Sequence, residues 1–313
     1  IKGQIQAKRA AEIAAAGHHN LLLVGSPGSG KTMIAKAMAG ILPPLTDDEL
    51  VETMMIRSTL GMETKPGRER PFRIVHFTAS TVSVCGGGAD LRPGEVSLAH
   101  RGVLFLDEFA EFPRHALEVL RQPLEDGHVA VSRASAAYDF PSRFMLVAAM
   151  NPCPCGYFPS DECRCNQAQV LKYQQRVSGP LLDRIDIQCG VWPVKPGELE
   201  NLRPGESSAA IRSRIVAARA IQAERYRGMP GVVTNAEAKS RDLKDICRLS
   251  GRAAEALHDK LRALDLSARA YDRVLRVART CADLKGRPDV TEEDVFAAAG
   301  YRELDRGGSS FWA

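Results

Sequence analysis

Short apolar runs alternate with helix-like stretches along the first two thirds of the chain. Five runs of four to eight residues have the length of strands that are buried on both faces: 21–24, 73–77, 103–108, 144–150 and 185–192. Helical patterns lie between most of them, for example at 4–16 and 114–126. The alternation predicts an α/β fold, a three-layer αβα core in which helices cover a mainly parallel five-stranded sheet.

The pattern changes after residue 193. Residues 194–208 are rich in proline, glycine and charge, which is typical of a linker. Beyond them only helical patterns remain, at 209–227, 235–249, 251–264, 267–284 and 291–300. Thr291, which acidic residues follow, resembles a helix N-cap. We therefore expect two units, an α/β core over residues 1–193 and a helical lid over 209–313.

Composition narrows the class of protein only slightly. The 313 residues carry 42 basic and 38 acidic side chains, and the net charge of +4 is too small to imply nucleic-acid binding by itself. No apolar stretch reaches the length of about 20 residues that crosses a bilayer, and no signal peptide is visible. We therefore expect no membrane contact and a cytoplasmic location. The chain opens on Ile1 rather than Met, which suggests a fragment of a longer protein.

A glycine-rich loop follows the first apolar run. "GSPGSGKT" at 25–32 matches the phosphate-loop pattern G-x-x-x-x-G-K-[ST] and opens a helical stretch. The glycines let successive backbone N–H groups point at phosphate oxygens, Lys31 reaches the β and γ phosphates, and the Thr32 hydroxyl can ligate Mg²⁺. The predicted ATP-binding residues are Gly25, Ser26, Pro27, Gly28, Ser29, Gly30, Lys31 and Thr32.

Two further apolar runs end in polar side chains that suit the same site. "VLFLDE" delivers Asp107 and Glu108 at its carboxyl end, where Asp107 would hold Mg²⁺ and Glu108 would polarise the attacking water. "FMLVAAMN" ends in Asn151, whose amide could orient that water. An acidic helix cap and a turn-forming Asn are the simpler interpretations. The order of the three motifs favours catalysis.

Four cysteines follow Asn151 almost directly. Cys153, Cys155, Cys163 and Cys165 form two C-x-C pairs around a seven-residue loop. Four thiolates can close a tetrahedral Zn²⁺ shell, and in a reducing compartment clustered cysteines more often bind metal than form disulfides. Metal-free thiols and an iron–sulfur cluster remain open. Our hypothesis is that a structural metal fixes the strand end at Asn151.

The order of these motifs resembles a known family. "GSPGSGKT", "PGEVSLAHRGVLFLDEFAEF", "FPSRFMLVAAMNPCPCG" and "SGPLLDRID" are similar to the magnesium-chelatase-like AAA+ ATPases and, more narrowly, to the ComM (YifB) family of bacterial natural transformation. The resemblance covers nearly the whole chain. It implies a homo-hexameric ring with ATP at the subunit interfaces and places Ile1 and Gln4 near the adenine. Members of that family usually carry a Lon-like domain before this region, and this sequence lacks it.

The resemblance also implies roles for three arginines. Arg184 in "LLDRID" matches the arginine finger that reaches into the neighbouring subunit's site. Without the resemblance, the local sequence favours a salt bridge from Arg184 to Asp183 or Asp186. Arg269 matches the lid arginine (sensor 2) that contacts the γ phosphate, and Arg273, one helical turn away, is the second choice. A solvated face of an arginine-rich helix is the alternative for both.

Two insertions mark this branch of the AAA+ proteins. One covers about 80–101 and contains three consecutive glycines, and the other, about 127–143, alternates apolar and polar residues as a β-hairpin does. In related motors such elements line a central pore and contact the phosphate backbone of DNA. Arg92, Arg133 and His128 are the predicted DNA contacts, with plain solvent exposure as the alternative.

Three functions follow from these expectations. The leading one is an ATP-driven hexameric helicase or branch-migration motor on single-stranded or branched DNA, which would help to integrate incoming DNA during natural transformation. The alternative is the ATPase subunit of a magnesium chelatase, which drives metal insertion into a porphyrin, although the double C-x-C element does not fit that subunit. A third is a nucleotide-gated assembly platform that forms a ring without translocation.

Overall fold

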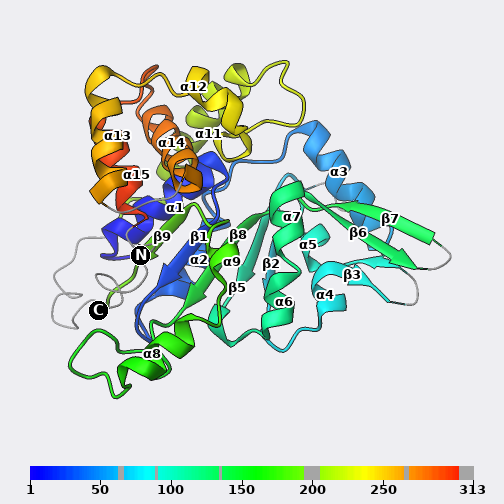
Figure 1. Ribbon diagram of the computed structural model, residues 1–313. Helices are drawn as coiled ribbons and strands as arrows, with labels where there is room; N and C mark the ends of the chain where they lie inside the picture. Colours follow the sequence, from blue (N-terminus) through cyan, green and yellow to red (C-terminus); the bar gives the residue numbers. More distant parts are fainter. Residues whose placement is uncertain (63–66, 89–90, 134–135, 194–204, 264–267, 303–313) are drawn as a thin grey trace.

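Five parallel strands form the centre of the molecule (Figure 1). The structure, a computed structural model, describes residues 1–62, 67–88, 91–133, 136–193, 205–263 and 268–302. The order across the sheet is β2-β5-β8-β1-β9, and every neighbouring pair is parallel. The strands are β1 (Leu21–Val24), β2 (Phe72–Val75), β5 (Val103–Leu106), β8 (Met145–Met150) and β9 (Ile187–Gly190). The predicted α/β class and the five-stranded parallel sheet are confirmed.

Both faces of the sheet are covered, which explains the continuous apolar runs. Leu21 and Leu23 pack in one hydrophobic cluster with α1 (Ile5–Gly17), α2 (Lys31–Met38) and helices of the C-terminal part. Leu22 and Val24 point into a second cluster on the other face. That cluster includes side chains of α4 (Thr81–Cys85), α5 (Glu95–Leu98), the 3₁₀ helix η1 (Phe109–Glu111), α6 (Arg114–Glu118), α8 (Gln167–Gln174) and α9 (Gly179–Leu182).

The two insertions form small antiparallel elements beside each other. The 127–143 segment is the predicted hairpin, β6 (His128–Arg133) paired with β7 (Ala136–Pro141). In the 80–101 segment, β3 (Gly86–Gly87) pairs with β4 (Arg92–Pro93) between α4 and α5. A Cβ atom added to Gly87 would lie 3.5 Å from a methyl of Val131, so the two elements are in contact. Nearby, α3 (Asp47–Ser58) begins with a capping box.

One expected helix of the core is interrupted. Residues 114–126 form α6 and then a separate helix α7 (Arg121–Asp126), rather than one continuous helix. Pro123 lies within this segment, and because proline has no N–H it cannot donate to the carbonyl one turn earlier. The helical pattern of this segment therefore corresponds to two short helices, and Gly127 caps the second one directly before the hairpin.

The C-terminal part is helical, with one departure from the predicted pattern. It contains α11 (Ser208–Arg225), α13 (Gly251–Ala263), α14 (Ala268–Leu284) and α15 (Glu292–Gly300), and Thr291 caps α15 as expected. The predicted helix over 235–249 was wrong. That segment holds only short pieces: η2 (Asn235–Glu237), η3 (Ser240–Asp242) and α12 (Leu243–Ile246). The buried Asn235 amide donates to Thr280 and Asp283, and these tertiary bonds outweigh helix propensity.

The core and the helical part share one hydrophobic cluster. Side chains of α1 and the sheet belong to the same cluster as side chains of α11, α13, α14 and α15, and Figure 1 shows α1 between the sheet and these helices. Most of the predicted linker lies outside the described residues, as does the chain after residue 302. Among the described helices, none combines the length and the apolar character that crossing a membrane requires.

Candidate active site

The predicted phosphate loop connects β1 to α2 at the carboxyl end of the sheet. Gly28 and Gly30 have φ angles of 73° and 95°, in the left-handed region that favours glycine. A Cβ atom on Gly25 would lie 1.9 Å from the carbonyl oxygen of Val191, so no side chain fits there. Two glycines of the motif therefore permit the backbone conformation, and Gly25 permits the close approach of Val191, the residue after β9.

Lys31 lies beneath this loop with all three of its donors used. Its Nζ atom donates to the carbonyl oxygens of Gly25 (2.7 Å) and Ser26 (2.9 Å) and to Oδ1 of Asn151 (3.1 Å). Burial lowers the pKa of Lys31, and the negative charge of Asp107 opposes that shift. These three oxygen atoms hold the Lys31 ammonium group where the motif predicts phosphate oxygens. The oxygens of a bound phosphate could replace them as acceptors.

Two hydroxyl groups of the loop are buried without a partner. The Oγ atoms of Ser26 and Ser29 contact no hydrogen-bond partner among the residues that the structure describes. Buried hydroxyls without a partner are costly, so such atoms point to a ligand that supplies acceptors. Together with the N-terminus of α2, they form a cradle whose donors suit a polyphosphate.

Asp107, which follows β5, lies beside the phosphate loop. The Thr32 hydroxyl donates to Oδ2 of Asp107 over 2.8 Å, and a hydroxyl beside a carboxylate is a donor set that suits Mg²⁺. The other carboxylate oxygen of Asp107 accepts from the backbone N–H of Glu108 over 3.0 Å. Glu108 is exposed and adopts a left-handed φ of 52°, so the chain turns sharply where the predicted catalytic carboxylate stands.

Asn151 and Gln4 connect the loop to its surroundings. The structure brings Asn151 to Lys31, so in this state its amide positions the lysine directly. Gln4 donates from Nε2 to the carbonyl oxygens of Ser29 (3.0 Å) and Trp192 (2.6 Å). The N-terminal segment, which we expected near the adenine, therefore lies against the phosphate loop.

The four clustered cysteines come together in space. Their sulfur atoms all lie within 4.8 Å of one another, and three of the separations are 3.4, 3.8 and 3.6 Å. In a tetrahedral zinc site with Zn–S bonds of about 2.3 Å, sulfur atoms lie about 3.8 Å apart. The backbone N–H groups of Gly156 and Phe158 also donate to the Cys153 sulfur, which favours a thiolate. The cluster therefore fits a metal ion.

Charge explains why a cation suits this cluster. Although burial alone would raise it, hydrogen bonds from the backbone N–H groups of Tyr157 and Arg164 lower the pKa of the Cys155 thiol to about 6. Burial and the neighbouring sulfurs raise the pKa of Cys163 to about 12. Four adjacent sulfurs cannot all be thiolates unless a positive charge lies between them.

The cysteine loop rests on the phosphate loop. Gly156 has a φ angle of 87°, and a Cβ atom there would lie 2.5 Å from Cδ of Pro27 and 3.7 Å from Cγ of Asn151. The Gln174 side chain also donates to the carbonyl oxygen of Pro152 over 3.1 Å. The sequence did not predict the contact between Gly156 and Pro27, since nothing in the cluster's spacing indicates what its loop touches.

Arg184 lies at the opposite end of the sheet. Its carbonyl oxygen accepts from the side chain of Asn20, the residue before β1, over 2.8 Å. Five residue steps of about 3.3 Å separate Asn20 from Gly25 along β1, or about 16 Å. The guanidinium forms an ion pair with Glu125 and donates to the carbonyl oxygen of Pro180 (2.6 Å). The cavity that the Arg184 side chain lines includes no residue of the phosphate loop.

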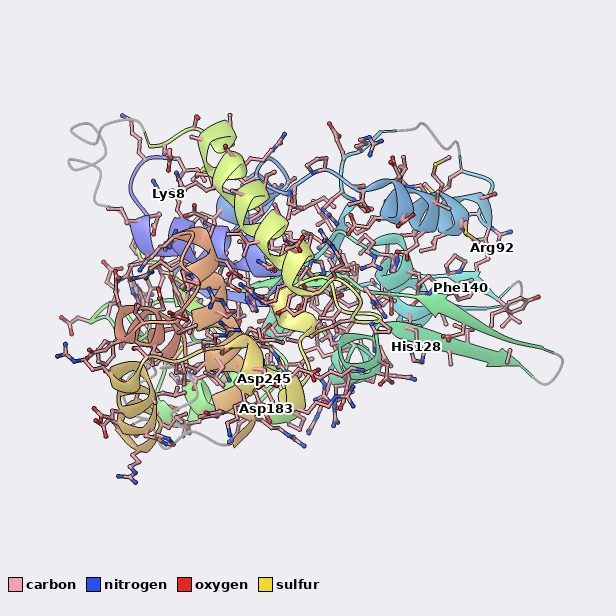
Figure 2. The ribbon with its side chains drawn as sticks, turned by 90° about the horizontal axis from the view of Figure 1, so that it is seen from above. Lys8, Arg92, His128, Phe140, Asp183 and Asp245 are labelled. Atoms are coloured by element: carbon pink, nitrogen blue, oxygen red, sulfur yellow. The ribbon has the colours of Figure 1, made fainter. Side chains whose placement is uncertain are left out.

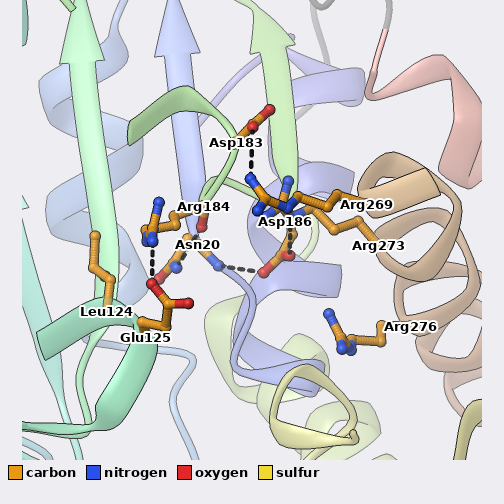
Figure 3. Close-up of a pocket in the computed structure, with 9 residues that line it drawn as sticks. All are labelled: Asn20, Leu124, Glu125, Asp183, Arg184, Asp186, Arg269, Arg273 and Arg276. Carbon is orange, nitrogen blue, oxygen red and sulfur yellow. Dashed lines mark hydrogen bonds and ion pairs between the residues drawn. The ribbon is translucent and has the colours of Figure 1, made fainter. Parts of the chain in front are cut away.

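The two lid arginines join Arg184 in a cavity of about 290 Å³ (Figure 3). Arg269 approaches Asp183 (3.8 Å), and Arg273 approaches Asp186 (3.6 Å). The acids that the sequence offered as partners of Arg184 therefore pair with the lid, and Arg184 pairs with Glu125. Sequence reasoning missed Glu125, because no local spacing relates it to Arg184. The structure brings the three predicted arginines together but not to Lys31 of the same chain.

The predicted DNA contacts lie at the insertions. Arg92 is exposed on β4, and His128, half-buried, begins β6. Arg133 ends β6, and its side chain lies outside the described residues. Figure 2 shows Arg92, His128 and Phe140 at one end of the molecule. On β7, the ring of Phe140 stacks with that of Tyr138, whose exposed fraction is 54%. The sequence analysis did not single out Tyr138, although an aromatic residue in an alternating hairpin was a visible signal.

Known proteins are similar to this chain over almost its whole length. The chain is 45% identical over 309 residues to the competence protein ComM of Haemophilus influenzae and 44% identical over 309 residues to the YifB protein of Salmonella typhimurium. In both cases the match covers 98% of this chain and 60% of the relative, so the chain spans about three fifths of these proteins. A magnesium-chelatase subunit ChlI of Chlorella vulgaris is 24% identical, over 88% of this chain and 78% of its own length.

Two family models match consecutive parts of the chain. Residues 1–199 match the model described as magnesium chelatase, subunit ChlI, and residues 205–302 match the model for the C-terminal part of that subunit. The first match contains the phosphate loop, the acidic strand, Asn151 and Arg184, and the second contains both lid arginines. The resemblance inferred from the motifs is therefore confirmed, and the chain belongs to the magnesium-chelatase family of the AAA+ fold.

Proposed function

We propose that this chain hydrolyses ATP within a ring of identical copies and uses the energy to move along DNA. The observation that carries the proposal is the separation of two half-sites: Lys31, Asp107 and Asn151 lie at the carboxyl end of the sheet, and Arg184 lies at the amino end. Neither half alone has the groups that phosphoryl transfer needs. A second copy completes the site when its amino end faces this chain's carboxyl end, and that head-to-tail contact generates a ring where the rotation between copies closes.

In this proposal each polar group has one task. Lys31 leaves its carbonyl acceptors for phosphate oxygens, while Thr32 and Asp107 would hold the Mg²⁺ that accompanies ATP and neutralises developing charge. Glu108 orients and polarises the attacking water. Asn151, released from Lys31, holds that water in place. Arg184 of the adjacent copy stabilises the charge on the transferred phosphoryl group, and Arg269 and Arg273 contribute positive charge from the lid.

The DNA part of the proposal rests on the two insertions. The glycine-rich β3–β4 element and the β6–β7 hairpin touch each other, and Arg92 and Tyr138 are exposed there. Cations that follow a phosphate backbone, combined with an exposed aromatic ring, are typical of surfaces that bind single strands. The name of the 45% identical competence protein supports a competence-related role. Single-stranded or branched DNA is the proposed partner, and the cytoplasm the proposed compartment.

The cysteine cluster fits Zn²⁺ in a structural role. All four ligands come from the protein, so no position is left for a substrate. Bound zinc would hold the loop of Gly156 against Pro27 and thereby support both the phosphate loop and the strand end at Asn151.

A second candidate function is the ATPase subunit of a magnesium chelatase. The family models and the 24% identical Chlorella relative favour it. The proposed ATP site is compatible with either function. Metal insertion into a porphyrin in the presence of chelatase partner subunits, without any response to DNA, would support this candidate instead.

ATP hydrolysis with and without forked DNA tests the proposal. We expect forked DNA to stimulate hydrolysis several-fold, and Tyr138→Ala to weaken single-strand binding about fivefold or more, since loss of one stacked base costs about 1–3 kcal/mol. Tyr138→Phe keeps the ring and should behave as the unaltered protein. Phe296→Ala, which removes an exposed aromatic residue from α15, is the matched control. ATP-dependent assembly without DNA stimulation would favour a non-translocating platform.

A further inference from the structure

Arg184 is retained by its own chain. One nitrogen of its guanidinium pairs with Glu125, another donates to Pro180, and its Nε atom is buried without a partner among the described residues. The side chain is only 17% exposed. A finger held in this way cannot extend to an adjacent copy, so something must exchange with its present partner.

Glu125 is suited to such an exchange. Its side chain is 64% exposed, so the pair with Arg184 is largely solvated and contributes little that a stronger acceptor could not replace. Phosphate oxygens accept two parallel hydrogen bonds from a guanidinium and carry more charge than a carboxylate. The cavity around the pair, about 290 Å³ in volume, leaves room for such a group.

Glu125 also lies at the base of the β6–β7 hairpin. It is in the last turn of α7, which Gly127 caps, and β6 begins at the residue after Gly127. The carbonyl oxygen of Gly127 accepts from the backbone N–H of Ser142 over 2.8 Å, where the hairpin returns. Arg143 follows and donates to Gly231 of the helical part over 2.9 Å. Only Asp126 and Gly127 separate Glu125 from the hairpin, so a displacement of Glu125 would also displace the base of the hairpin.

We propose that Glu125 is a positioning residue that holds Arg184 in a retracted state, and that a phosphate of the neighbouring copy's nucleotide competes with Glu125 for the guanidinium. The exchange releases the end of α7 and thus connects nucleotide occupancy to the hairpin. This inference rests on the proposed function, because it assigns a regulatory partner to the arginine of that site.

The test compares Glu125→Gln with the unaltered protein in basal and DNA-stimulated ATP hydrolysis. Loss of the retaining charge should raise the basal rate about two- to fivefold, the size expected for one largely exposed ion pair, and lower the apparent KM for ATP. The ratio of stimulated to basal rate should fall by a similar factor. Glu125→Asp keeps the charge and should restore the original ratio. Glu224→Gln is the matched control, since it breaks an exposed pair with Arg227 outside the cavity.

The outcomes separate this inference from the proposed function. If Arg184→Ala abolishes hydrolysis and Glu125→Gln leaves the basal rate and KM unchanged, the retaining role is wrong and the proposed site stands. A fall in rate with Glu125→Gln also overturns it, because Glu125 would then hold Arg184 in its productive position. If neither protein responds to DNA, the motor is contradicted, while the basal comparison still decides the role of Glu125.

Discussion

The two ends of the central sheet are held by different kinds of contact. At the carboxyl end, Lys31 donates to backbone carbonyls and a neutral amide, Gly25 packs against a carbonyl oxygen, and a cysteine cluster supports the loop. At the amino end, Arg184, Arg269 and Arg273 are paired with carboxylates, two of them over more than 3.5 Å. The first arrangement is prebuilt and the second is exchangeable. In the proposed ring, a site divided in this way would bind ATP in one copy and be completed by the arginine of the next.

Removal of Arg184, the proposed arginine finger, should have the largest effect. Arg184→Ala should lower kcat about 10³-fold or more, because an arginine supplied in trans stabilises the charge of the transition state. Hydrolysis by purified protein in excess ATP measures it. Full activity of Arg184→Ala would show that the amino end of the sheet takes no part in hydrolysis.

Mixing experiments show which copy Arg184 serves. Equal amounts of Arg184→Ala and Lys31→Ala proteins should recover about a quarter of the original activity, since about a quarter of head-to-tail contacts then pair an intact loop with an intact finger. If the finger acted within its own chain, the mixture would stay inactive.

Loss of the phosphate-loop lysine should be almost as severe. Lys31→Ala should lower hydrolysis about 10²-fold or more, by removing a positive charge from the phosphates, and leave the fold intact. Binding of a fluorescent ATP analogue and thermal unfolding are the measurements. Lys36→Ala, on the exposed side of the same helix, should change neither.

Removal of the metal ion should lower the rate of ATP hydrolysis about tenfold. Stripping the ion with a chelator, or changing Cys163 to Ser, should lower the Tm by several degrees and hydrolysis with it, because the metal ion would then no longer hold the loop of Gly156 against Pro27. Elemental analysis identifies the ion. Cys85→Ser, outside the cluster, serves as control. If the protein without metal remains fully stable and active, the cysteine cluster does not support the phosphate loop.

The contact between the two loops should have the smallest effect. Gly156→Ala places a methyl group 2.5 Å from Pro27 at a φ of 87°, and should raise the KM for ATP several-fold by displacing the phosphate loop. Gly228→Ala is the matched control, because its φ is 84° and nothing lies within 4 Å. It should cost about 1 kcal/mol of stability and leave KM unchanged.

Much of the carboxyl end could be predicted, because its signals are local. Strands buried on both faces leave continuous apolar runs, and the polar residues that end them meet at one end of a parallel sheet. The amino end could not be predicted in the same way. Glu125 and Arg184 are 59 residues apart, and Gly156 meets Pro27 only after folding. The helix expected over 235–249 failed for a related reason, since buried bonds of Asn235 decide that backbone.

The alanine-rich first helix makes the chain hard to divide. Ala7, Ala10, Ala14 and Ala16 of α1 are almost fully inaccessible, in the hydrophobic cluster that also contains α11 and α14. Small side chains let neighbouring helices approach closely and exclude water along the whole seam. Residues 1–193 and 205–302 expressed together as separate chains should therefore co-purify, and expression of either piece alone should give insoluble protein. Recombinant work on this protein should keep both halves in one polypeptide.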